Sequence, residues 1–102
     1  MPTVQEALSR LDHELAVARH EGFLIVKIIH GYGSRGVGGE IRIAAQKRLR
    51  EMSDHGEIRE CIFGENWGKS DEQSWKLLGT YPQLKEDRDL GRKNRGITVV
   101  LL

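Results

Sequence analysis

A chain of 102 residues is long enough for one folded domain and too short for two separate hydrophobic cores. Its residues are 38% hydrophobic and 30% charged, which is typical of a folded domain and excludes a disordered chain. The formal net charge of +1 excludes a strongly basic or acidic protein, although charged residues can still gather in local patches.

Cysteine content and hydropathy indicate where such a protein functions. The one cysteine, Cys61, excludes a disulfide framework, and we interpret it as a small buried hydrophobic residue. No apolar run approaches the roughly 20 residues of a membrane-spanning helix, and the first residues do not resemble a signal peptide. We therefore expect a cytoplasmic protein that has no membrane partner.

The first predicted element is a helix over residues 4–20. Thr3 and Glu6 form a capping box, in which each side chain can satisfy an unpaired backbone amide. Apolar residues follow at helical spacing, and Gly22 provides the stop. The apolar positions are Val4, Ala7, Leu8, Leu11, Leu15 and Ala18.

A strand, a loop and a second helix are predicted next. Residues 23–29 are almost continuously apolar, which indicates a strand covered on both faces, as in a parallel sheet. Residues 31–39 contain five glycines and predict a loop. A helix over residues 40–52 follows, and its predicted buried residues are Ile41, Ala45, Leu49 and Met52.

The remaining elements complete a small sheet. Residues 58–63 predict a second strand, which should run parallel to the first because a helix joins them. Residues 64–96 form an extended connection with a short helix over 71–78, capped by Ser70 with Gln73. We expect Trp75 to lie in the core and favour Trp67 over it as a base-stacking candidate. Residues 97–102 predict a buried final strand.

This order of elements predicts one α/β domain over residues 1–102, a two-layer sandwich with a small mixed sheet. Two glycine patterns within it are weak indications of nucleotide binding. The pattern in residues 31–36 matches a dinucleotide-binding loop, but the chain lacks the further strand–helix units of that fold. Residues 64–70 resemble a phosphate-binding loop with Phe63 in place of its first glycine.

Local charge and backbone chemistry indicate an anionic ligand. A glycine-rich loop before a helix presents free amides to an anion, and Arg35 in that loop can form a bidentate contact with a phosphate. His30, at the end of a strand, can act as a general acid or base, or can simply shape the turn. Arg92, Lys93 and Arg95 form a basic cluster, although on composition alone a solvated surface is the favoured interpretation.

Two sequence segments resemble the Smr (small MutS-related) domain family. The first is Ile28-Ile29-His30-Gly31-Tyr32-Gly33 before a helix, and the second is Gly96-Ile97-Thr98-Val99 near the end. The resemblance implies a βαβαββ fold without its first strand, and a function in nucleic-acid binding or nicking. Many members carry Asp-Leu-His-Gly on a first strand, where an acid or histidine is implicated in cleavage, and this sequence has no such segment. Binding is therefore better supported than cleavage.

We thus predict a nucleic-acid-binding domain that is a candidate endonuclease, with a non-catalytic protein or ribonucleoprotein interaction module as the alternative. His30 is the candidate catalytic residue. The candidate nucleic-acid-binding residues are Gly31, Gly33, Arg35, Arg42, Arg92, Lys93 and Arg95. No residues have metal-ligand spacing, so we expect no resident metal or cofactor, and a divalent ion would arrive with a nucleic-acid substrate.

Overall fold

The computed structural model describes residues 2–31 and 37–102. Three α-helices, three strands and two short 3₁₀ helices make up this part of the chain. In chain order they are α1 (Val4–His20), β1 (Ile25–Ile29), α2 (Val37–Asp54), β2 (Glu60–Phe63), η1 (Gly64–Asn66), α3 (Glu72–Thr80), η2 (Pro82–Glu86) and β3 (Ile97–Leu101). The predicted α/β fold is confirmed.

Helix α1 has the predicted bounds, and of the predicted capping box the Thr3 half is formed. The Thr3 hydroxyl accepts a hydrogen bond from the Glu6 amide at 3.1 Å, which satisfies one unpaired donor of the first turn. The chain leaves the helix through Gly22, whose φ of +84° is a conformation that glycine adopts without strain. The buried residues Leu11 and Leu15 lie one turn apart, on the side that packs against α2.

The sheet has the order β1-β3-β2, and both pairings are antiparallel. Strands β1 and β2 therefore run in the same direction, as predicted, but β3 lies between them. The sheet has no parallel pair, so the mixed sheet that we expected is wrong in this detail. Strand β3 is the most deeply buried strand, since residues 97–100 are each at most 4% exposed, and its central place accounts for that burial.

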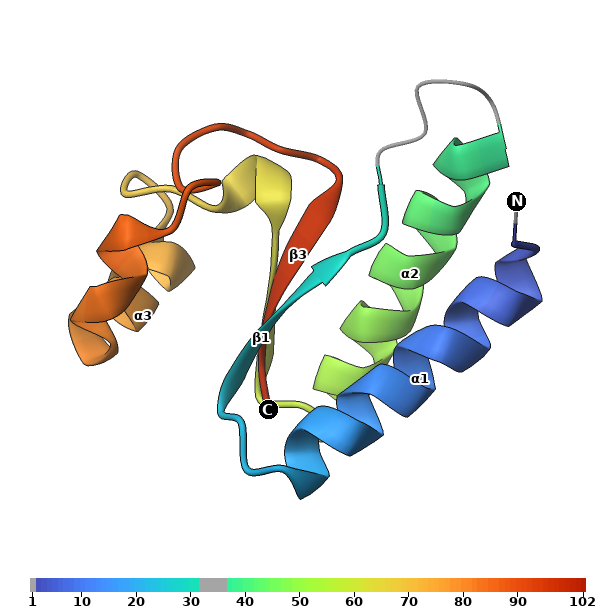
Figure 1. Ribbon diagram of the computed structural model, residues 1–102. Coiled ribbons are helices and arrows are strands. Elements are labelled where there is room, and N and C mark those ends of the chain that lie inside the picture. The colour runs from blue at the N-terminus through green and yellow to red at the C-terminus, as the bar shows by residue number, and fades with distance from the viewer. Residues whose placement is uncertain (1, 32–36) are drawn as a thin grey trace.

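Helices cover both faces of the sheet (Figure 1). Helices α1 and α2 lie on one face, where Val100 of β3 joins their apolar cluster, and α3 lies on the other, where Ile97 and Val99 belong to a second cluster. The chain therefore buries two apolar clusters, one on each face of one sheet, and not the single core that its length led us to expect. Alternation along β3 sends successive side chains to opposite faces. The connection between β2 and β3 thus adds a third layer to the two-layer arrangement that we predicted.

Several element boundaries differ from the predictions. Strand β1 begins at Ile25, while Phe23 and Leu24 are 55% and 59% exposed. Because β1 pairs with a neighbour on one side only, it is an edge strand, and its residues are half-buried or exposed and not fully buried. Helix α2 begins at Val37, three residues before the expected start, so its first turn includes Gly38 and Gly39. Strand β2 begins at Glu60 and not at residue 58.

The connection between β2 and β3 contains the largest corrections. Helix α3 is capped by Asp71, whose carboxylate accepts from the Ser74 amide at 2.9 Å, and not by Ser70. Trp67, the favoured stacking candidate, is 1% exposed, and its indole nitrogen donates to the Asp87 carboxylate at 2.9 Å. Trp75, expected in the core, is 58% exposed. The burial of the two tryptophan side chains is therefore the reverse of the prediction.

Candidate nucleic-acid interface

The turn after β1 is held by the loop that enters β3. The amides of His30 and Gly31 both donate to the carbonyl oxygen of Gly96, each at 3.0 Å. Gly31 has a φ of +77°, a conformation that glycine adopts without strain. The antiparallel pairing of β1 and β3 accounts for this meeting, because the start of β3 lies beside the end of β1. His30 and Gly31 are called the His30 turn below.

Both nitrogens of the His30 ring have a hydrogen-bond partner. Nδ1 lies 2.8 Å from the Gly31 carbonyl oxygen, and Nε2 lies 2.9 Å from the Thr98 hydroxyl. A carbonyl oxygen can only accept, so we assign the proton of the neutral ring to Nδ1. Nε2 then accepts from Thr98, whose side chain is fully buried. The ring therefore satisfies a buried hydroxyl group and closes the turn.

Burial lowers the pKa of His30 below its ordinary value. The hydrogen bond to the Gly31 carbonyl opposes this shift, and the positive charge of Arg42 adds to it. His30 is consequently neutral at pH 7, in keeping with the hydrogen bond that it accepts from Thr98. An anion bound nearby would favour the charged ring and raise this pKa.

Arg42 is the cation next to this histidine, in the second turn of α2. Its Nη1 donates to the Gln46 side-chain oxygen at 3.3 Å, and Gln46 donates in turn to Glu65 at 3.2 Å. The Nε atom of Arg42 is buried and has no hydrogen-bond partner. Within residues 2–31 and 37–102, Arg42 forms no ion pair with a carboxylate. The charge of this half-buried side chain is thus not balanced by a carboxylate bound directly to it in the described part of the chain.

The other predicted binding residues are only partly brought to this turn. Gly33 and Arg35 lie outside the described residues. Arg92, Lys93 and Arg95 are exposed in the loop between η2 and β3, and Arg95 directly precedes Gly96. Lys93 has a φ of +55°, an uncommon and strained conformation for a residue with a side chain.

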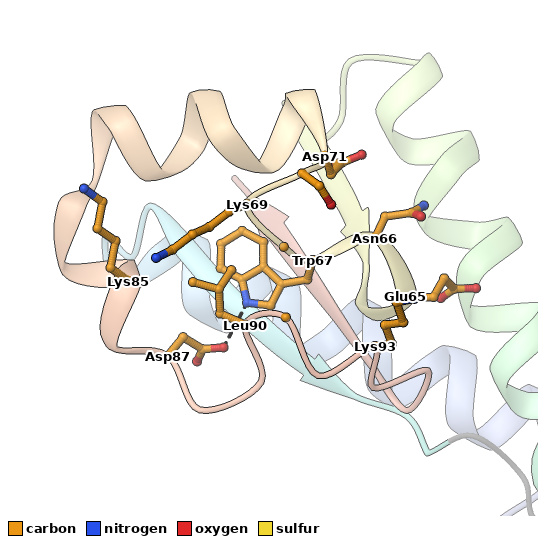
Figure 2. A pocket seen from close by; sticks show the side chains of 12 residues that line it. Glu65, Asn66, Trp67, Lys69, Asp71, Lys85, Asp87, Leu90 and Lys93 are labelled. Carbon is orange, nitrogen blue, oxygen red and sulfur yellow. Dashed lines mark hydrogen bonds between the residues drawn. The ribbon is translucent and has the colours of Figure 1, made fainter.

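Lys93 also lines a surface cavity of about 700 Å³ in the connection between β2 and β3. Figure 2 shows Lys69 and Lys85 on one side of the Trp67 ring and Lys93 on the other. In the described part of the chain these three lysines form no ion pair. We call this hollow the lysine cavity.

The acidic residues that line the lysine cavity are each bound within the protein. The Asp87 carboxylate accepts from Trp67 and forms an ion pair with Lys27, and the Asp71 carboxylate accepts from Ser74. Glu65 accepts from the Gln46 amide. Among the described residues only Asp87 is paired with a cation, so Asp71 and Glu65 keep their negative charge, while the three lysines are more exposed than the three carboxylates.

Sequence reasoning missed the side chains that hold the His30 turn. Thr98 was part of the quoted motif, yet its role as the partner of His30 had no sequence signal beyond a polar residue in an apolar strand. Gln46, which accepts from Arg42, and Glu65, which accepts from Gln46, had no sequence signal. The remaining histidines, His13, His20 and His55, are exposed. In the residues that the structure describes, no group of three histidine, cysteine, aspartate or glutamate side chains is placed to hold a metal ion.

None of the helices that the structure describes is both long and apolar enough to span a bilayer. Comparison with curated proteins and with solved structures finds no match. The family model described as Smr domain matches residues 1–65, which include α1, β1, the His30 turn, α2 and β2. This match covers more than half of the chain, and the chain belongs to the Smr domain family.

Proposed function

We propose that this protein binds nucleic acid through the His30 turn, with Arg42 as the central phosphate contact. Membership in the Smr family supports nucleic acid as the class of ligand. The observation that carries the proposal is the half-buried Arg42 guanidinium, which has an unpartnered Nε atom beside a neutral His30. A buried donor without a partner is costly in the free protein, so an anion that accepts from it gains affinity.

Further phosphate contacts come from the loop before β3 and from the lysine cavity. Arg95 adjoins Gly96, which is hydrogen-bonded to the His30 turn, and Lys93 leads from the same loop into the cavity with Lys69 and Lys85. A nucleic-acid strand that follows these cations would contact the protein through its phosphates and not through base edges. The binding is then independent of sequence and strongly dependent on salt.

His30 fits a positioning role in this proposal better than a catalytic one. Its basic Nε2 atom faces the buried Thr98 hydroxyl, and its Nδ1 proton is donated to Gly31. A general base needs a free lone pair within reach of the substrate, and neither nitrogen offers one in this arrangement. We therefore propose binding without cleavage by His30.

Fluorescence anisotropy with labelled 20-nucleotide RNA and DNA, across a series of KCl concentrations, tests this function. The Arg42→Gln substitution should weaken binding at low salt and reduce the slope of log K against log salt by roughly 0.7–0.9. Lys47→Gln is the matched control, because Lys47 is exposed on another side of the same helix. Equal effects of both substitutions, or affinity that is insensitive to salt, would contradict the proposal.

Cleavage is tested separately by incubating supercoiled plasmid and labelled RNA with the protein, with and without Mg²⁺. We expect no nicked or shortened product above background. A product that the wild type forms and His30→Ala does not form would show that His30 is catalytic.

A protein or ribonucleoprotein interaction module is the second candidate function, and the exposed apolar residues around β1 favour it. Phe23, Leu24 and Ile29 are 55%, 59% and 79% exposed, along the free edge of the sheet. Exposed apolar side chains beside an unpaired strand edge are a feature of protein contact sites. If Ile29→Ser abolishes capture of a protein partner while nucleic-acid affinity is unchanged, the second function is supported.

A further inference from the structure

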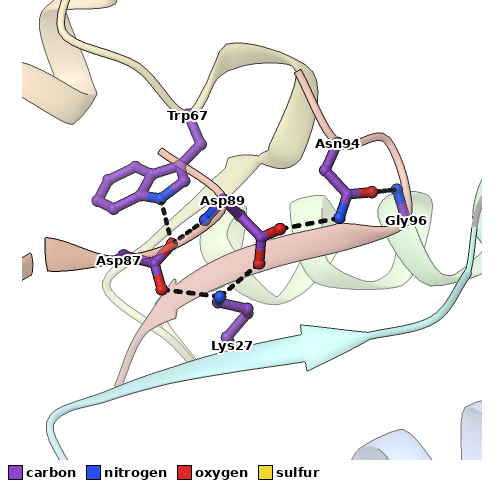
Figure 3. A network of polar contacts seen from close by, with 6 residues as sticks. All are labelled: Lys27, Trp67, Asp87, Asp89, Asn94 and Gly96. Carbon is purple, nitrogen blue, oxygen red and sulfur yellow. Dashed lines mark hydrogen bonds and ion pairs between the residues drawn. The ribbon is translucent and has the colours of Figure 1, made fainter. Parts of the chain in front are cut away.

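A continuous series of polar contacts joins β1 to the connection between β2 and β3 and ends at Gly96 (Figure 3). Gly96 in turn is hydrogen-bonded to the His30 turn. The series begins at Lys27 in the middle of β1. Its ammonium group lies 2.7 Å from an oxygen of Asp87 and 2.5 Å from one of Asp89. These three side chains are at most 24% exposed, so the contacts are shielded from solvent.

Asn94 carries the series from Asp89 to the turn. Its Nδ2 donates to the second oxygen of Asp89 at 3.0 Å, and its Oδ1 accepts from the Gly96 amide at 2.9 Å. The carbonyl of the same Gly96 accepts from the amides of His30 and Gly31. The Asn94 side chain therefore holds Gly96, and the carbonyl of Gly96 holds the His30 turn.

The surroundings leave the loop from Asn94 to Gly96 little freedom to adopt another position. A Cβ atom at Gly64 would lie 1.7 Å from the Asn94 carbonyl oxygen, so the loop packs directly on the backbone at that residue. Asp89 is held as an anion, because the hydrogen bonds from Lys27 and then Asn94 lower its pKa. The burial of Lys27 disfavours its charge, yet the hydrogen bonds and charges of Asp87 and Asp89 outweigh that effect and raise its pKa.

We infer that Asn94 is a positioning residue for the nucleic-acid interface, since it couples the Lys27–Asp89 ion pair to the Gly96 carbonyl that orients the His30 turn. Asn94 and Asp89 lie beyond residues 1–65, the part that the family model matches. The inference rests on the proposed function, because the His30 turn is the proposed binding site. It makes the connection between β2 and β3 a part of that site and not only an added layer.

Amide hydrogen exchange, measured by NMR on the free protein, tests the inference without nucleic acid. In Asn94→Ala, the His30 and Gly31 amides should exchange at least about tenfold faster, while those of Leu15 and Leu49 in the helix core keep their protection. If Asn94 only stabilised the fold, all of these amides would accelerate together. Asn66→Ala is the control, since the exposed Asn66 side chain has no described partner. Equal acceleration everywhere, or none at the turn, would overturn the inference.

Asn94→Asp separates the link to Asp89 from the local turn and also serves if the alanine variant does not fold. An aspartate keeps the oxygen that accepts from Gly96, as in other turns of this kind, but it lacks the donor and repels Asp89. We expect faster exchange at His30 and Gly31, to a smaller extent than with alanine. Wild-type protection at both amides would show that Asp89 has no part in positioning the turn.

Nucleic-acid binding gives the second readout. Asn94→Ala should weaken binding to a 20-nucleotide strand about three- to tenfold, with an unchanged salt slope, because the substitution removes no phosphate-contacting charge. A reduced slope would mean that a phosphate contact was lost and would contradict a positioning role. If the wild type binds no nucleic acid, the proposed function fails, and the exchange experiment still decides the role of Asn94.

Discussion

The two sides of the sheet are stabilised in different ways. On the side of α1 and α2, the buried cluster is apolar, and the accompanying ion pair of Arg48 and Asp12 is about 40% exposed. On the side of α3, the apolar cluster around Trp67 is accompanied by the shielded contacts of Lys27 with Asp87 and Asp89. Both sides thus bury apolar residues, but the ion pair of the first side is exposed, whereas those of the second side are shielded from solvent. Substitutions should expose this difference.

The largest effect is expected at Gly64, which follows β2 and packs against the backbone of the loop that enters β3. Gly64→Ala would place a methyl group 1.7 Å from the Asn94 carbonyl oxygen and 2.8 Å from that of Ile97, and these are backbone atoms that cannot turn aside. We expect a loss of roughly 3–5 kcal/mol in the free energy of unfolding, measured by urea denaturation. Gly79→Ala in α3 is the control, since nothing lies within 4 Å and alanine should add about 0.5–1 kcal/mol.

The second largest effect is expected from Lys27→Met. The substitution leaves Asp87 and Asp89 shielded and close together without their cation, which should cost about 2–4 kcal/mol. Arg48→Met removes the cation of the exposed pair with Asp12 and should cost at most about 1 kcal/mol. Urea denaturation of both variants compares the two sides directly. Equal losses would show that both pairs contribute alike.

The same difference explains what the sequence could predict. Helix α1 and the buried residues of α2 follow from apolar spacing and from the Thr3 cap, because both signals are local. The motif at the His30 turn was visible, and the antiparallel start of β3 brought Gly96 to it. Trp67 and Trp75 could not be assigned correctly, because a tryptophan is buried or exposed according to contacts that are distant in sequence. Asp87, the partner of Trp67, is 20 residues away.

Lys27 shows the same limit in a single residue. It interrupts an apolar strand, which is a visible signal, but its partners Asp87 and Asp89 lie about 60 residues further along the chain. Neither acid could be chosen from the six aspartate and glutamate side chains of residues 64–96 without the fold, and the strand register alone decides which face of the sheet the lysine occupies.

A smaller effect is expected at His30. The His30→Ala substitution removes the partner of the buried Thr98 hydroxyl and should cost about 1–3 kcal/mol. It should also change the response to acid. Because the folded-state pKa of His30 is lowered, the unfolded chain takes up its proton first, and stability falls as the pH drops from about 6.5 to the folded value.

Urea denaturation between pH 8 and pH 5 measures this loss, which His30→Ala should lack and the exposed control His55→Ala should retain. Asp89 affects the pH dependence of stability in a more acidic range than His30 does. Its lowered pKa stabilises the fold above the unfolded value of about 3.9, and this contribution disappears as the pH falls further. A wild type whose stability is constant from pH 8 to pH 5 would contradict the neutral, buried state of His30.

The smallest effect on stability, combined with a loss of affinity, is expected at Lys93. Its φ of +55° is better tolerated by asparagine than by lysine, so Lys93→Asn should leave the free energy of unfolding within about 0.5 kcal/mol or raise it. The substitution removes one cation from the lysine cavity, so the salt slope of nucleic-acid binding should fall by roughly 0.7–0.9. Lys76→Asn is the control for charge, because Lys76 is exposed on α3 and pairs with Glu72 at 3.7 Å. If the lysine cavity lies outside the interface, the two substitutions will change the slope equally, and the strained backbone at Lys93 will have no connection with binding.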